Sequence, residues 1–248
     1  MVFDAAAQSF EYDPAKIEQK KPFRIAELYV SAENTGGDWY GYDYQESSQR
    51  LLICLGDVTG HGMNSALVTL AVAGAVRSTF KLLDSNGPKF TVSEALYLLF
   101  QSAQEAVRFS GKQSDKLMTM VFALIDTAKY EMAYFNAGHL PIYVKTKGEL
   151  HQVLQPGNPL GINSAEEFSP RLVPLDSDSM IFFYTDGLIE NHGPSGKQIK
   201  ARDLQKILRN LDSPEAIKGA IQEKIKETWG DTALDDDVSF MCFHLKAS

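Results

Sequence analysis

Aspartates stand at four points where apolar, strand-like runs of this sequence begin or end: Asp38, Asp57, Asp186 and Asp236. Carboxylates gathered in one place repel one another unless cations hold them. An all-oxygen ligand set suits hard ions such as Mg²⁺ or Mn²⁺ and does not suit Zn²⁺. Four carboxylates can hold two such ions, and a pair of ions can activate water for in-line attack on a phosphoryl group. The pattern therefore indicates a dinuclear hydrolytic centre.

Each acid taken alone also has a simpler structural interpretation. Aspartate beside glycine is common in turns, and the triplet Asp235–Asp237 is typical of a solvated strand cap. Asp126 and the pair Asp176 and Asp178 are expected to be turn residues of this kind. Other catalytic patterns are missing from the sequence, namely a P-loop, a Gly-x-Ser-x-Gly elbow and His-x-x-x-His spacing. The metal hypothesis rests on the four acids acting together.

Composition limits the classes of partner. The chain has 248 residues, with 32 acidic against 24 basic side chains and a net charge of -8. This balance argues against a generic nucleic-acid or anionic-membrane surface, and it repels phosphate unless a cation intervenes. Cys54 and Cys242 lie in apolar runs, which predicts buried, reduced thiols. No signal-peptide pattern or membrane-length apolar run is evident. We expect a cytoplasmic protein, or the cytoplasmic catalytic domain of a larger sensor protein.

The elements that must position the acids follow from hydrophobic periodicity. A polar lead-in, 1–22, precedes one domain, 23–248. Strands are predicted at 23–30, 39–44, 50–55, 117–125, 131–136, 140–145, 151–154, 180–184 and 238–245, and helices at 63–83, 91–109, 202–210 and 214–228. Helical spacing gives the 63–83 helix an apolar face that contains Leu67 and Leu70. The meander of strands favours an α+β fold, with two packed, mainly antiparallel sheets flanked by helices in an α-β-β-α sandwich.

Several motifs, taken together and in order, resemble the metal-dependent type 2C protein serine/threonine phosphatases, in particular the bacterial SpoIIE/RsbU-like branch. The resemblance covers roughly residues 23–245. The matching pieces are Gly36-Gly37-Asp38-Trp39-Tyr40, Gly56-Asp57-Val58-Thr59-Gly60-His61-Gly62, Asn136-Ala137-Gly138-His139, Pro159-Leu160-Gly161, Tyr184-Thr185-Asp186-Gly187 and Asp236-Asp237-Val238-Ser239. Each motif is weak alone, whereas six in order are specific.

The resemblance implies the type 2C phosphatase fold and two bound Mn²⁺ or Mg²⁺ ions. Asp57 would bridge the ions, and the main-chain carbonyl of Val58 would add a ligand. Asp38 would hold one ion, while Asp186 and Asp236 would hold the other. The acidic triplet leaves the register open, with Asp237 as the fallback for Asp236.

The resemblance also implies hydrolysis of phosphoserine or phosphothreonine by a water activated at this centre, without a phosphoenzyme. His61 is the candidate general acid, because histidine titrates near neutral pH. In the wider family the acid histidine lies two residues after the bridging aspartate, where this chain has Thr59. The other interpretation is that His61 positions the start of the next helix. His139 is expected to be structural.

Members of this branch commonly act on a phosphorylated regulatory protein of the anti-sigma-factor antagonist type. An upstream sensor domain or an activating partner is expected, with residues 63–109 as the regulatory element, and a homodimer is left open. Eukaryotic relatives carry an arginine just before the first metal-binding acid, but residues 32–35 contain none. We therefore expect metals and main chain to hold the phosphate, with weak affinity for small esters. The alternatives are a catalytically silent module that binds a regulatory partner and a hydrolase of small phosphate esters.

Overall fold

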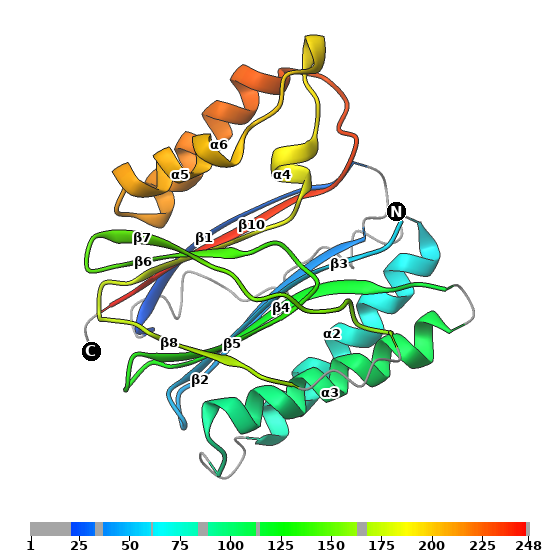
Figure 1. Cartoon of the computed structure of the whole chain (residues 1–248), viewed down its shortest axis with the longest axis vertical. Helices are drawn as coiled ribbons and strands as arrows, with labels where there is room; N and C mark the ends of the chain where they lie inside the picture. The colour runs from blue at the N-terminus through cyan, green and yellow to red at the C-terminus, as the bar shows by residue number, and fades with distance from the viewer. Residues whose placement is uncertain are drawn as a thin grey trace. The chain divides into compact units, whose positions relative to one another are not determined.

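The computed structural model describes residues 21–32, 37–60, 62–83, 89–112, 115–162 and 168–246. The chain divides into two compact units, each built around one five-stranded antiparallel sheet (Figure 1). The first unit carries Asp38 and Asp57, and the second carries Asp186 and Asp236.

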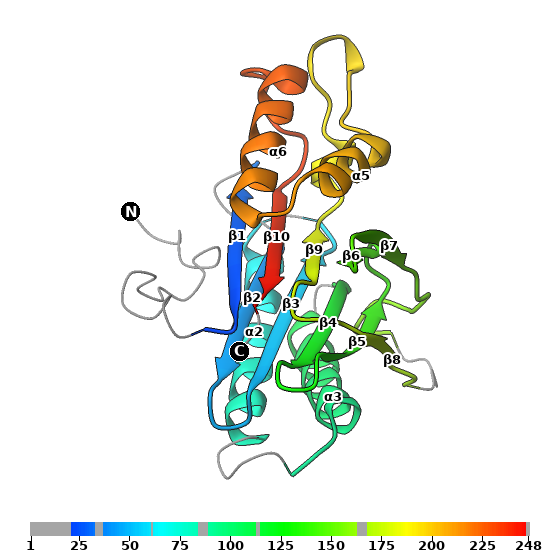
Figure 2. The ribbon, with the colours of Figure 1, turned by 90° about the vertical axis from the view of Figure 1, so that its left-hand side faces the viewer.

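The sheet of the first unit has the order β2-β3-β4-β5-β8, and helices α2 and α3 cover one of its faces (Figures 1 and 2). A single apolar core joins the helices to this face, and Phe122, Leu99 and Val72 are fully buried in it. The elements are β2 (Asp38–Gln45), β3 (Arg50–Val58), α2 (Met63–Leu83), α3 (Val92–Gly111), β4 (Met118–Asp126), β5 (Glu131–Ala137) and β8 (Arg171–Pro174).

Helix α3 begins where its sequence places a capping box. The side chain of Thr91 accepts from the Glu94 N–H at 3.2 Å, while the Glu94 carboxylate accepts from the Thr91 N–H at 2.8 Å. This exchange lowers the pKa of the Glu94 carboxyl, because the Thr91 N–H and hydroxyl both stabilise its charged form. The structure thus places the N-cap of α3 at Thr91.

Helix α2 has the predicted bounds but buries a different face. Leu67 is 54% exposed and Leu70 is 45% exposed, whereas Val68 and Val72 are fully buried. The predicted face is wrong because small and β-branched residues, and not the leucines, pack on α3 and the sheet. By length and composition alone α2 could cross a membrane. That test is weak evidence for a helix with eight residues buried in a folded unit.

The sheet of the second unit has the order β1-β10-β9-β6-β7 (Figure 2). Its apolar core includes side chains from α5 and α6. Buried Lys145 of β6 closes the end of α5: its ammonium donates to the carbonyls of Leu208, Arg209 and Leu211 and pairs with Asp212 at 2.6 Å. The elements are β1 (Phe23–Val30), β6 (Ile142–Thr146), β7 (Glu149–Val153), β9 (Met180–Tyr184), α4 (Gly187–Glu190), a 3-10 turn (Pro194–Gly196), α5 (Ala201–Asn210), α6 (Pro214–Trp229) and β10 (Val238–Leu245).

The predicted pattern of antiparallel sheets with helices is confirmed, and most element bounds agree within two residues. Strand β3 continues to Val58, so Asp57 lies inside a strand instead of after one. Strand β8 and the short helix α4 were not predicted, because four residues carry too little periodicity. Cys54 and Cys242 are buried and free, as expected. The single domain at 23–248 stays a prediction, and 1–20 of the lead-in lie outside the described residues.

Candidate metal centre

The acids of the first unit are direct partners across two strands. Asp38 of β2 pairs in register with Asp57 of β3, and Asp38 is only 4% exposed. Like charges directly opposite each other destabilise a sheet, and a buried carboxylate needs a compensating charge. The two acids therefore fit a hard divalent cation, whose oxygen preference they match.

Gly37 brings the chain close to this pair in a way that only glycine permits. Its carbonyl accepts from the Val58 N–H at 3.2 Å. A Cβ built on Gly37 would lie 2.8 Å from the Val58 carbonyl oxygen and 3.1 Å from Oδ1 of Asp57. The predicted carboxylate and carbonyl ligands thus both face the same glycine, and the missing side chain leaves the space beside them clear.

The loop after Asp57 is tied to the start of β4. Thr59 donates its N–H to the Leu117 carbonyl at 2.9 Å, and its hydroxyl accepts from the Leu117 N–H at 3.1 Å. The Ser65 hydroxyl of α2 donates to the Gly60 carbonyl at 2.9 Å. The loop is therefore held from both sides, by a neighbouring strand and by the helix that follows it. His61 lies outside the described residues, so its role stays a prediction.

The turn after β5 places His139 beside β4. The Asn136 side chain exchanges two hydrogen bonds with the His139 backbone, at 2.7 and 2.8 Å. Gly138 adopts a φ of 74°, which an L side chain rarely tolerates. The ring Nδ1 of His139 then lies 2.8 Å from the Thr119 hydroxyl, and Thr119 is the register partner of Asp57. Sequence reasoning placed His139 in a structural turn, and the turn holds its ring near the acid pair.

The acids of the second unit lie in two loops that one buried side chain joins. Asn191 accepts at Oδ1 from the N–H groups of Asp235 and Asp236. Its Nδ2 donates to the carbonyls of Gly187 at 2.7 Å and Asp236 at 2.8 Å. The loop after β9, which carries Asp186, is thereby fixed to the loop before β10. Sequence reasoning missed Asn191, since nothing in a lone asparagine shows that it is buried between two segments.

The three aspartates of the acidic triplet differ in their hydrogen-bond partners. Asp237 is buried, and its Oδ1 accepts from the Ala32 N–H at 2.8 Å and the Ser31 hydroxyl at 3.1 Å. Hydrogen bonds from the side chain and N–H of His192 lower the pKa of the Asp235 carboxyl below its ordinary value. Asp236 is exposed, and its Oδ1 accepts from the N–H of Asp237. These contacts give the outer acids structural tasks and favour Asp236 as the ligand.

Asp186 directly precedes the short helix α4. Burial raises the pKa of the Asp186 carboxyl above its ordinary value, and the nearby Glu190 carboxylate adds to the rise. Both causes oppose a negative charge at this position in the metal-free chain. A bound cation would remove that opposition, so Asp186 fits the predicted role of a ligand.

Each unit thus supplies one pair of acids. Within the described residues, no three His, Cys, Asp or Glu side chains gather into one metal-binding group. The assembly of all four acids into one centre stays a prediction.

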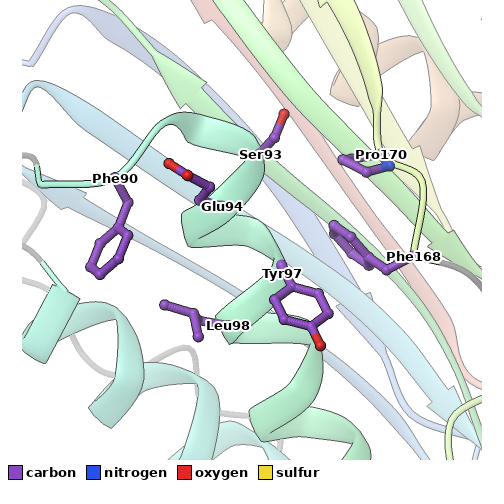
Figure 3. A pocket seen from close by; sticks show the side chains of 7 residues that line it. All are labelled: Phe90, Ser93, Glu94, Tyr97, Leu98, Phe168 and Pro170. Carbon is purple, nitrogen blue, oxygen red and sulfur yellow. The ribbon is translucent and has the colours of Figure 1, made fainter.

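A separate apolar cavity of about 510 Å³ lies in the first unit, beside the N-terminal half of α3 (Figure 3). The rings of Tyr97 and Phe168 meet edge to face there, 5.1 Å apart. The acid among the lining residues is Glu94, which already caps α3. The cavity contains none of the predicted ligands. The lining residues are Phe90, Ser93, Glu94, Tyr97, Leu98, Phe168 and Pro170.

Comparison with known proteins identifies the class of this chain. The family model described as Stage II sporulation protein E (SpoIIE) matches residues 47–246, so the chain belongs to the SpoIIE family. It carries a phosphatase domain of the type 2C (PP2C) fold. The SiaA-PP2C domain of Pseudomonas aeruginosa has this fold with a TM-score of 0.72 at 21% identity, over 90% of this chain and 86% of that one. The predicted family and fold class are confirmed.

Two further proteins are similar to this chain. The phosphoserine phosphatase RsbP of Bacillus subtilis is 29% identical over 171 residues, 67% of this chain. The chain spans only 40% of the length of that relative. RsbX, solved in complex with magnesium, matches with a TM-score of 0.67 at 14% identity, over 90% of this chain and 96% of that one.

Proposed function

We propose that this chain hydrolyses phosphoserine or phosphothreonine on a regulatory protein of the anti-sigma-factor antagonist type. The observation that carries the proposal is the register pairing of buried Asp38 with Asp57, because two opposed carboxylates at a strand end need a cation. Membership of the SpoIIE family and similarity to a phosphoserine phosphatase support the reaction class.

Two Mn²⁺ or Mg²⁺ ions would be held by Asp38, Asp57, the Val58 carbonyl, Asp186 and Asp236 in the proposed site. When bound, such ions supply Lewis acidity, which stabilises charge on phosphoryl oxygens and makes water more acidic. This chain's own residues position the ligands: Gly37 leaves space beside Asp57, and Asn191 fixes the loops that carry Asp186 and Asp236. His61 would donate the proton that the leaving serine oxygen needs.

The partners follow from the same proposal. A phosphorylated protein is the substrate, and an upstream sensor domain or an activating partner controls the enzyme in the cytoplasm. Because two divalent ions would carry the positive charge that this acidic chain lacks, the metal-free protein should bind phosphoprotein poorly.

The decisive experiment measures phosphate release from a phosphoserine protein in Mn²⁺ and in EDTA, with Asp57→Asn alongside. We expect release only with Mn²⁺, and a loss on the order of 1,000-fold in the variant, because a metal ligand contributes several kcal/mol to the transition state. Asp43→Asn is the matched control, since Asp43 lies on the same strand as Asp38 but pairs with Lys81 at 2.8 Å. Asp43→Asn should retain activity.

Equal release in Mn²⁺, in EDTA and by the Asp57 variant would disprove a metal mechanism. The alternative function is a catalytically silent module of the same fold that binds a regulatory partner. An inactive wild-type chain that still binds the phosphorylated protein would support that alternative.

A further inference from the structure

A lysine from another segment lies against the loop that follows Asp57. Lys116 stands two residues before β4, and its ammonium donates to the Thr59 carbonyl at 2.5 Å. The Thr59 hydrogen bonds to Leu117 fix the same two segments together. The pairing of β3 with β4 therefore holds the backbone that carries Lys116 beside the Thr59 loop, and the hydrogen bond to Thr59 places the ammonium.

Gly60 connects this ammonium to the acid pair. A Cβ built on Gly60 would lie 2.9 Å from Nζ of Lys116. A Cβ built on Gly37 would lie 3.0 Å from the Gly60 carbonyl and 3.1 Å from Oδ1 of Asp57. Gly60 is thus a close neighbour of the Lys116 ammonium, and Gly37 is a close neighbour of both Gly60 and the Asp57 carboxylate.

Lys116 differs from other lysines of the chain in its partners. Lys81, Lys129 and Lys145 each form an ion pair with an aspartate. Among the ion pairs of the described residues, none includes Lys116. A lysine ammonium carries three N–H donors, and the Thr59 carbonyl takes one of them. In a chain of net charge -8, the ammonium of this half-buried lysine, which has no carboxylate partner among the ion pairs of the described residues, is suited to an anion.

We propose that Lys116 binds the phosphoryl group of the substrate. This inference rests on the proposed phosphatase function and adds a binding residue to its site. The ammonium would donate to a non-bridging phosphoryl oxygen, a charge-assisted hydrogen bond whose strength exceeds that of a neutral one. Lys116 would then supply the cation that residues 32–35 lack. Lys116 would add a side chain to the metals and main chain that are expected to hold most of the phosphate.

The test compares wild-type chain with Lys116→Met, which keeps the length of the side chain and removes its charge. We expect KM for a phosphoserine protein and the inhibition constant of inorganic phosphate to rise about 10-fold or more, because hydrogen bonds between charged groups are worth that much. Lys116→Arg should recover most of the affinity. Lys129→Met is the matched control, since Lys129 is an exposed lysine in the turn between β4 and β5 that pairs with Asp126.

Calorimetric titration with Mn²⁺ separates phosphate binding from a purely structural role. If Lys116 only holds the Thr59 loop in place, Lys116→Met will weaken Mn²⁺ binding. If Lys116 binds phosphate, Mn²⁺ affinity will stay unchanged or rise, since a positive charge beside the acids has been removed. Weaker Mn²⁺ binding, or an unchanged KM in an active enzyme, would overturn the inference.

Failure of the proposed function gives a different result. If the wild-type chain releases no phosphate with Mn²⁺, the phosphatase proposal fails. Binding of inorganic phosphate to the Mn²⁺-loaded chain, measured by calorimetry with and without the Lys116 substitution, then still decides this inference. Equal phosphate binding by both chains would refute it.

Discussion

Asp38 and Asp57 belong to two paired strands, near the end of the pair, whereas Asp186 and Asp236 lie in loops next to strands β9 and β10. Main-chain hydrogen bonds between β2 and β3 fix the positions of Asp38 and Asp57, and these positions do not depend on any one side chain. The second pair depends on Asn191, whose amide makes contacts with both loops. The predicted aspartate ligands are therefore held by backbone pairing in the first unit and by a single buried side chain in the second.

The two regions also use glycine differently. Gly37 leaves room beside ligand atoms, since a Cβ there would approach Asp57 and Val58. Gly187 instead allows two segments of backbone to touch, because its Cβ would lie 1.9 Å from the Asp237 carbonyl. Substitutions in the first unit should therefore perturb metal binding, and substitutions in the second should first perturb folding.

The largest effect is expected for Asn191→Ala. Removing this side chain leaves two N–H groups and two carbonyls without their partner, at a cost of about 3 kcal/mol in the free energy of unfolding. Urea denaturation measures that cost, and hydrogen exchange should show lost protection at 235–237 while β2 and β3 keep theirs. Exposed Asn210→Ala is the control and should change stability by less than about 0.5 kcal/mol. Loss of protection in β2 and β3 as well would contradict the view that backbone pairing holds the first pair of acids and Asn191 holds the second.

A smaller effect on stability is expected for Gly37→Ala. The new methyl group must displace the Val58 carbonyl or the Asp57 carboxylate, at about 1–3 kcal/mol. Because ligand atoms are displaced, Mn²⁺ affinity should fall along with stability. Thermal denaturation and Mn²⁺ titration measure the two quantities.

The control for this substitution is Gly74→Ala on the exposed side of α2. Nothing lies within 4 Å of a Cβ at Gly74, so the change should stabilise the helix by up to about 1 kcal/mol. An unchanged Mn²⁺ affinity in Gly37→Ala would show that the space beside Asp57 is not needed for the metal.

Sequence reasoning predicted most of the strands well, because strands depend on local patterns, whereas the four acids as one set of metal ligands stay a prediction. The apolar runs of β1, β9 and β10 fix these strands to the residue. The predicted buried face of α2 was wrong, because periodicity does not say whether small or large residues face α3. Leu67 and Leu70 are exposed. Lys116 and Asn191 were missed because their environment comes from pairing between distant segments. A basic residue just before a predicted strand was the one signal for Lys116.

The smallest effect concerns the charge of Asp186 in the metal-free chain. Burial and Glu190 raise the pKa of this carboxyl in the folded state. Its contribution to stability is therefore present below the ordinary pKa of aspartate, about 4, and is lost as pH rises through the raised value. In EDTA at pH 7, Asp186→Asn should thus stabilise the chain by at most about 1 kcal/mol, and the gain should vanish below about pH 4. Exposed Asp231→Asn serves as the control in the same unit.

With Mn²⁺ added, the order of stability reverses and the wild-type chain becomes more stable than Asp186→Asn, because the wild-type carboxylate then gains a ligand bond that the amide does not provide. Thermal denaturation across pH, with and without Mn²⁺, measures whether the variant is more or less stable than the wild type in each condition. A wild-type chain that remains less stable than the variant when Mn²⁺ is bound would remove Asp186 from the set of ligands and leave the second unit with Asp236 alone.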